Sequence, residues 1–223
     1  MRNFAAILAQ FVREFSPPHR QFGLCLLPDA ARSSGISGVE ENRLVAALVP
    51  NPLLNQLYDY WRSKRGVRRM PRRADIDPLE IPADIWPHTM LLDVIWEGAH
   101  TPRFRYRRVG EVFWRDSPHD PTGHFIDEVL PEQAGYRRYV VGIYEEMAHR
   151  RAAMYTASSF TLDGRPEPAV TQRVSLPLSN DGEIVNMVLA AHAFEHGILT
   201  RDMALARATA LSEIARVILE DAV

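Results

Sequence analysis

Three successive segments in the second half of the chain have the hydrophobic pattern of strands. Residues 154–162 and 183–194 are two of them, and apolar side chains alternate with polar ones along 170–178 between them. Asp163–Gly164 and Asn180–Gly182 provide tight turns between the three segments. Because strands joined by tight turns run antiparallel, the pattern predicts a three-stranded meander.

Two more strands are predicted earlier in the chain. The apolar run MLLDVIW (90–96) is followed by a turn around Gly98 and then by FRYRRVG (104–110). Residues 111–130 are interrupted by prolines and a glycine, which favours short helical turns. Gly110 and Gly123 are expected at close-packed or positive-φ positions, where valine would destabilise the domain.

Helical spacing of apolar residues predicts three helices. Asn51 is a suitable N-cap for the first helix, Pro52 suits its first position, and Gly66 can end it. The second helix starts at Pro131 and carries an apolar stripe. Residues 200–222 repeat alanine, leucine and isoleucine at alternating intervals of four and three, which predicts a C-terminal helix with a weak coiled-coil seam.

Composition limits the class of protein. The chain has 223 residues, 46% of them hydrophobic and 24% charged, with a formal net charge of −2. These values are typical of a soluble globular protein and give no overall field that would attract nucleic acid. The single cysteine, Cys25, favours a reducing cytoplasm. No apolar run reaches the roughly 18 residues of a membrane-spanning helix.

The chain divides into three predicted parts. Residues 1–48 form an irregular N-terminal extension with a short amphipathic helix at most, and their sequence does not favour a secretory signal. Residues 49–197 form the main domain together with its leading helix. Residues 198–223 form the C-terminal helix.

The main domain resembles bacterial single-domain PAS proteins, which carry no attached catalytic domain. The likeness rests on the order and spacing of several short motifs between residues 50 and 195. These motifs are LYDYW (57–61), MPRRADIDP (70–78), LLDVIW (91–96), FRYRRVG (104–110), DPTG (120–123), IDEVL (126–130) and SLPLSNDGEIVNMVL (175–189). The resemblance implies an α+β fold, with a five-stranded antiparallel sheet and helices packed on one face. It also implies a sensory or regulatory role.

A PAS-type module holds a small molecule between its long helix and the inner face of its sheet. Gln172 is of interest because a buried amide must find hydrogen-bond partners, which a ligand, the backbone or water would supply. The ligand, like any cofactor, is unknown. The predicted pocket residues are Tyr139, Ile143, Met147, Gln172, Val174, Met187 and Leu189.

Other chemistry has little support in the sequence. His119 and His124, or His192 and His196, are poorly placed for a shared metal, and His149 is followed by arginines as at a solvated helix end. No nucleophile elbow, phosphate-binding glycine loop or paired-cysteine site is present, so no enzyme is predicted.

A basic segment, Arg62–Arg73, is followed closely by Asp75, Asp77, Glu80 and Asp84. Pairing with these acids is favoured over a nucleic-acid surface. The expected partners are a small molecule or a signalling protein. Homodimerisation through the terminal helices and packing of these helices within one chain both stay open.

The sequence therefore predicts a cytoplasmic sensor module that passes its state on by protein contact. A small enzyme with its active site in the same cavity and an interaction adaptor with a filled core are the alternatives.

Overall fold

The computed structural model describes residues 48–98, 100–114, 120–132, 135–162, 168–195 and 208–219. The predicted N-terminal extension therefore lies outside the described residues, apart from Leu48. Short 3-10 turns precede the first strand and follow the second. The helices and strands are α3 (Pro52–Arg65), β1 (Thr89–Glu97), β2 (Thr101–Val109), α4 (Ile126–Val129), α5 (Tyr136–Arg150), β3 (Ala153–Leu162), β4 (Ala169–Leu178), β5 (Met187–Glu195) and β6 (Ala208–Leu219).

The strands form one antiparallel sheet in the order β2-β1-β5-β4-β3-β6. The predicted meander is confirmed as β3-β4-β5, and the predicted pair before it is β1-β2. The α+β class and the antiparallel sheet are thus confirmed, but the sheet has six strands instead of five.

The sixth strand corrects the predicted C-terminal helix. Residues 208–219 pair with β3 along its length, from Leu162↔Ala208 to Ala153↔Leu219. Pairing gives the edge of β3 a partner, and this long-range gain overrides a weak local helix preference. Because residues 208–219 form a strand, they cannot supply the helix through which a dimer was expected. Dimerisation itself stays a prediction. Residues 198–207 and 220–223 lie outside the described residues.

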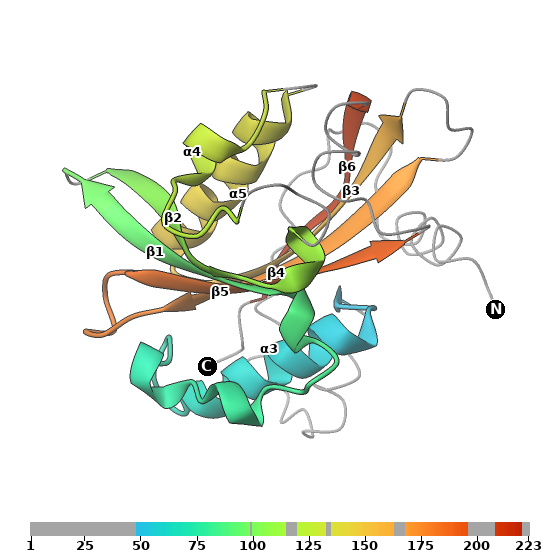
Figure 1. Cartoon of the computed structure of the whole chain (residues 1–223). Helices are drawn as coiled ribbons and strands as arrows, with labels where there is room; N and C mark the ends of the chain where they lie inside the picture. Colours follow the sequence, from blue (N-terminus) through green and yellow to red (C-terminus); the bar gives the residue numbers. More distant parts are fainter. Residues whose placement is uncertain are drawn as a thin grey trace, which may run out of the picture.

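Helices cover both faces of the sheet (Figure 1). On one face lie α4 and α5, where the ring of Tyr144 packs 5.5 Å from that of Phe104 on β2. On the other face lies α3, where Trp61 Nε1 donates a hydrogen bond to the Pro177 carbonyl oxygen at 2.9 Å. The prediction of helices on one face thus holds for α4 and α5, while the leading helix covers the opposite face.

Local signals in the sequence set the ends of α3. Asn51 Oδ1 accepts hydrogen bonds from the backbone nitrogens of Leu53 and Leu54, at 3.1 and 3.2 Å. Gly66 ends the helix with a φ of 58°. Both features are as predicted, because caps depend on residues close in sequence.

The two glycines singled out in the sequence hold constrained positions. A Cβ on Gly110 would lie 2.0 Å from the Pro87 carbonyl oxygen, so no side chain fits there without a backbone shift. Gly123 has a φ of 88°, a conformation that L-residues rarely adopt. Its backbone nitrogen donates to the Tyr106 carbonyl oxygen at 2.7 Å and so ties this turn to β2.

Candidate ligand cavity between helix and sheet

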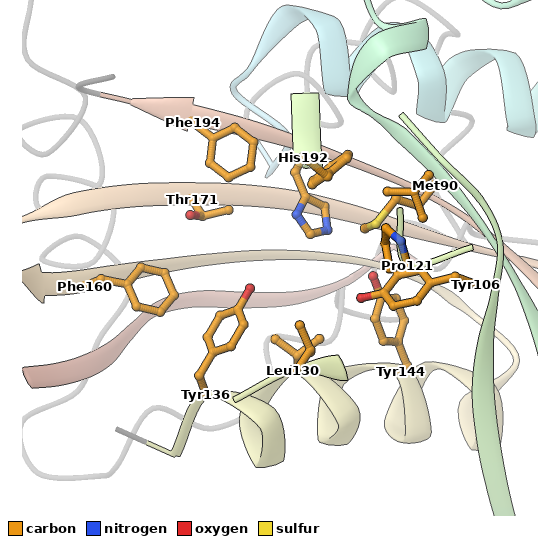
Figure 2. Close-up of a pocket in the computed structure, with 13 residues that line it drawn as sticks. Met90, Tyr106, Pro121, Leu130, Tyr136, Tyr144, Phe160, Thr171, His192 and Phe194 are labelled. Carbon is orange, nitrogen blue, oxygen red and sulfur yellow. The ribbon is translucent and has the colours of Figure 1, made fainter. Parts of the chain in front are cut away.

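A cavity of about 60 Å³ lies between α5 and the sheet. That is several times the space one buried water needs. Figure 2 shows side chains from the helix and from several strands converging on it. The residues that line it are Met90, Tyr106, Val109, Phe113, Pro121, Leu130, Tyr136, Val140, Tyr144, Phe160, Thr171, His192 and Phe194.

Periodicity places these side chains on one side of the sheet. Tyr136, Val140 and Tyr144 lie four residues apart along α5, so they share one helix face. His192 and Phe194 lie two apart on β5 and project from the same face of the sheet. The cavity thus combines a helical stripe with alternate strand positions.

Aromatic rings make much of the wall and contact one another edge-on. The ring centroids of Tyr136 and Phe160 lie 5.4 Å apart, and those of Phe113 and Phe194 lie 5.9 Å apart. Phe113 also packs against His192, with centroids 5.0 Å apart. Rings in such contact form a shaped apolar wall that suits an apolar or aromatic group.

His192 is the titratable imidazole in this wall. Burial, together with the nearby charges of Arg173 and His88, holds its pKa well below the ordinary value, so the ring is neutral. Its Nε2 atom has no hydrogen-bond partner. A neutral ring with a free nitrogen can serve a ligand as donor or acceptor, depending on the tautomer.

Arg173 lies beside the cavity on the same face of the sheet. It pairs directly with His192 across β4 and β5, and its side chain is buried, with 1% of its surface exposed. Nη1 donates to Ser158 Oγ at 2.9 Å, and the guanidinium carbon lies 5.7 Å from the centre of the Tyr139 ring. Nε and Nη2 have no hydrogen-bond partner.

Three hydroxyl groups on this side are also without partners. They belong to Tyr139 and Tyr144 on α5 and Thr156 on β3. Burial raises the pKa of Tyr144, so its phenol remains protonated. Unmet polar groups are rare in protein cores and carry a cost of about 1–3 kcal/mol each. Their gathering beside one cavity therefore indicates a site for a polar ligand or for water.

None of the seven predicted pocket residues lines this cavity. Ile143 and Met147 are buried on α5, and Tyr139 is half-buried against Arg173. The four strand residues project from the opposite face of the sheet, toward α3; they are Gln172, Val174, Met187 and Leu189. The structure therefore does not bring the helix and strand residues of this set together, and contact of any of them with a ligand stays a prediction.

The four strand residues were expected to face α5 but face α3, and the sequence could not show this because both faces of the sheet are covered. Residues of both parities along β5 are buried, as Val188 and Leu189 show with 0% and 2% exposure. Alternation then gives no signal for which parity faces α5. Gln172 finds its partner on the α3 side, where its Oε1 accepts from the Tyr155 hydroxyl at 2.9 Å. The sequence analysis missed Arg173 and His192. Their signal was that they are polar residues in strands that are buried on both faces.

Among the described residues, no group of three histidine, cysteine, aspartate or glutamate side chains is placed to hold a metal ion. His149 packs against Trp96, with ring centroids 5.4 Å apart. His192 and His124 lie in the described residues, while His119 and His196 lie outside them. No helix among the described residues is long and apolar enough to span a membrane.

The basic segment pairs with the acids that follow it. Lys64 forms an ion pair with Glu80, and Arg68 forms one with Asp75 at 2.7 Å. Arg73 donates to the Ile76 carbonyl oxygen at 2.9 Å. Two of the predicted pairings between the basic segment and the following acids, Lys64–Glu80 and Arg68–Asp75, are thus present.

The fold and cavity define a class of protein: a single-sheet α+β module with a small cavity between one helix and the sheet. Comparison with protein families gives the same class, since residues 50–159 match a family model described as a PAS domain. This part of the chain is therefore a PAS domain and belongs to a family of sensory and regulatory modules. Comparison with curated proteins and with solved structures gives no significant match.

Proposed function

We propose that this PAS domain is a sensor that binds a small molecule in the cavity between α5 and the sheet. The observation that carries the proposal is the cavity itself, walled by aromatic rings and bordered by buried polar atoms without partners. A pocket of mainly apolar lining with a few convergent polar groups is the usual form of a small-molecule site. The single cysteine in the sequence supports a cytoplasmic location.

Binding would be passed on through α5. This helix supplies one wall of the cavity, and its Glu146 bonds Arg216 on β6 and Arg150 on α5 itself. A ligand that prefers one packing of α5 over another shifts the population of the two packings. The change would then reach β6 at the sheet edge and a protein partner in contact with it.

The lining supports binding without catalysis. Among the described residues that line it there is no aspartate, glutamate, lysine or cysteine, and its imidazole, His192, is held neutral by burial. A general acid–base mechanism needs titratable groups whose pKa values lie near the working pH. We therefore propose a binding module and not an enzyme.

Native mass spectrometry of the full-length protein purified from cells tests the proposal. The expected result is a mass excess that disappears on denaturation. Val140→Phe would fill part of the cavity and should remove the excess. Val141→Phe is the matched control, because Val141 is half-buried on the same helix and does not line the cavity.

Two results would contradict the proposal. One is a bound molecule that persists in Val140→Phe and is lost in Val141→Phe. The other is an apo mass in the wild type that remains apo after incubation with a library of small organic compounds. The second result would favour an adaptor with a filled core.

A further inference from the structure

Two arginines approach the ring of Tyr139, and they differ in their partners. The guanidinium carbons of Arg216 and Arg173 lie 5.9 and 5.7 Å from the ring centre. Arg216 donates to Glu213 at 2.9 and 2.6 Å and also bonds Glu146. Arg173 forms no ion pair with any described carboxylate, although it is the more deeply buried of the two.

The free atoms of Arg173 define a specific geometry. Ser158 takes Nη1, which leaves Nε and Nη2 without partners. The N–H bonds of these two nitrogens run parallel along one edge of the planar guanidinium. That edge matches the two oxygens of a carboxylate, which it binds in a bidentate manner.

Arg173 does not itself line the cavity but is a direct neighbour of residues that do. Thr171 is two residues before Arg173 on β4, and His192 is directly opposite on β5; both line the cavity. His192 Nε2 and the Tyr144 hydroxyl add two more polar atoms without partners. One buried cation, Arg173, and several neutral polar groups thus lie next to the cavity.

We propose that Arg173 binds the carboxylate of a small organic acid whose apolar body occupies the cavity. The inference rests on the proposed function and names the chemical class of its ligand. A buried cation without a counter-ion is strongly unfavourable, and a bound carboxylate would supply the missing charge and two hydrogen bonds.

The residues in and around the cavity favour a ligand with a single carboxylate group. No lysine or arginine lines the cavity, and Arg173 is the cation that borders it among the described residues. A phosphate or a dicarboxylate would bring a second negative charge with no cation to meet it. The aromatic lining, in turn, favours an apolar or aromatic body over a polar one.

The test is isothermal titration calorimetry of the full-length, dialysed protein with four probes. Benzoate and butanoate are the carboxylates, and benzamide and butanamide are uncharged compounds of nearly the same shape. The expected result is binding of at least one carboxylate that is tighter than binding of its amide, on the order of 10- to 100-fold.

Three variants locate the charge. Arg173→Gln should weaken carboxylate binding by the same order and leave amide binding unchanged. Arg173→Lys keeps the charge but loses the parallel N–H pair, so it should also weaken binding, by a smaller factor. Arg216→Gln is the matched control, because that arginine already has carboxylate partners, and it should leave carboxylate affinity unchanged.

Several outcomes would overturn the inference. Equal binding of benzoate and benzamide, or full carboxylate binding by a folded Arg173→Gln protein, would remove the anion site and leave the proposed function intact. No binding of any probe would also overturn this inference. The native mass spectrum then decides the proposed function separately, because a bound neutral molecule would keep the cavity as a ligand site.

Discussion

The two faces of the sheet treat their buried polar groups differently. On the α3 face, Trp61 donates to a backbone carbonyl of β4, and the Tyr155 hydroxyl donates to Gln172. On the α5 face, Arg173, His192 and Tyr144 keep polar atoms without partners beside a cavity. Unmet polar groups lower stability, so the α5 face gives up stability that the α3 face retains. One sheet thus combines a face that holds the fold together with a face that we propose to bind a ligand.

The largest expected effect is on the α3 face. Trp61→Ala removes a ring that is 2% exposed and stacks on Tyr58, with centroids 6.0 Å apart. The cavity left behind should cost about 3–5 kcal/mol of unfolding free energy in urea titrations. Tyr136→Ala at the half-buried cavity wall is the comparison and should cost less. Equal losses would remove the distinction between the two faces.

A second pair of variants compares the spare room on each face. Val174→Phe overfills the closed α3 face and should cost about 1–3 kcal/mol. Val140→Phe adds the same atoms beside an existing cavity and should cost less than about 1 kcal/mol. Thermal and urea unfolding of both proteins checks this. A larger loss for Val140→Phe would mean that the cavity cannot take a phenyl group.

Removing single hydroxyl groups sharpens the comparison. Tyr155→Phe takes away the donor to Gln172 Oε1 and should cost about 1–2 kcal/mol. Tyr144→Phe removes a hydroxyl that has no partner, so the ligand-free protein should be unchanged or slightly more stable. Urea unfolding of both variants measures these losses. A larger loss for Tyr144→Phe than for Tyr155→Phe would mean that the Tyr144 hydroxyl has the better hydrogen bonds.

The smallest expected effect is the loss of folding stability at mildly acidic pH. Because burial holds the pKa of His192 well below its unfolded value of about 6.5, the folded state binds fewer protons than the unfolded state below that pH. Stability should therefore fall as the pH drops below about 6.5, with this residue contributing up to about 1.4 kcal/mol per pH unit. His192→Gln should flatten the dependence between pH 6.5 and 5.5. An unchanged slope would mean that other groups cause it.

How far the sequence predicted the molecule follows from the range of the interactions involved. The cap of α3 at Asn51 and the β3-β4-β5 meander were predicted correctly because neighbouring residues determine them. The strand β6 was missed because its partner β3 lies dozens of residues away and alanine-rich spacing also fits a helix. A cavity between helix and sheet was predicted, but the residues that line it were not.

The sequence by itself determined the local elements, their turns and the antiparallel order of the meander, since backbone preferences and tight turns act over a few residues. Only the tertiary structure decided which strand residues face α5, because both parities of the central strands are buried and both faces are covered. The tertiary structure alone also decided that Arg173 on β4 lies directly opposite His192 on β5. Strand register, fixed by packing on both faces, creates that pair.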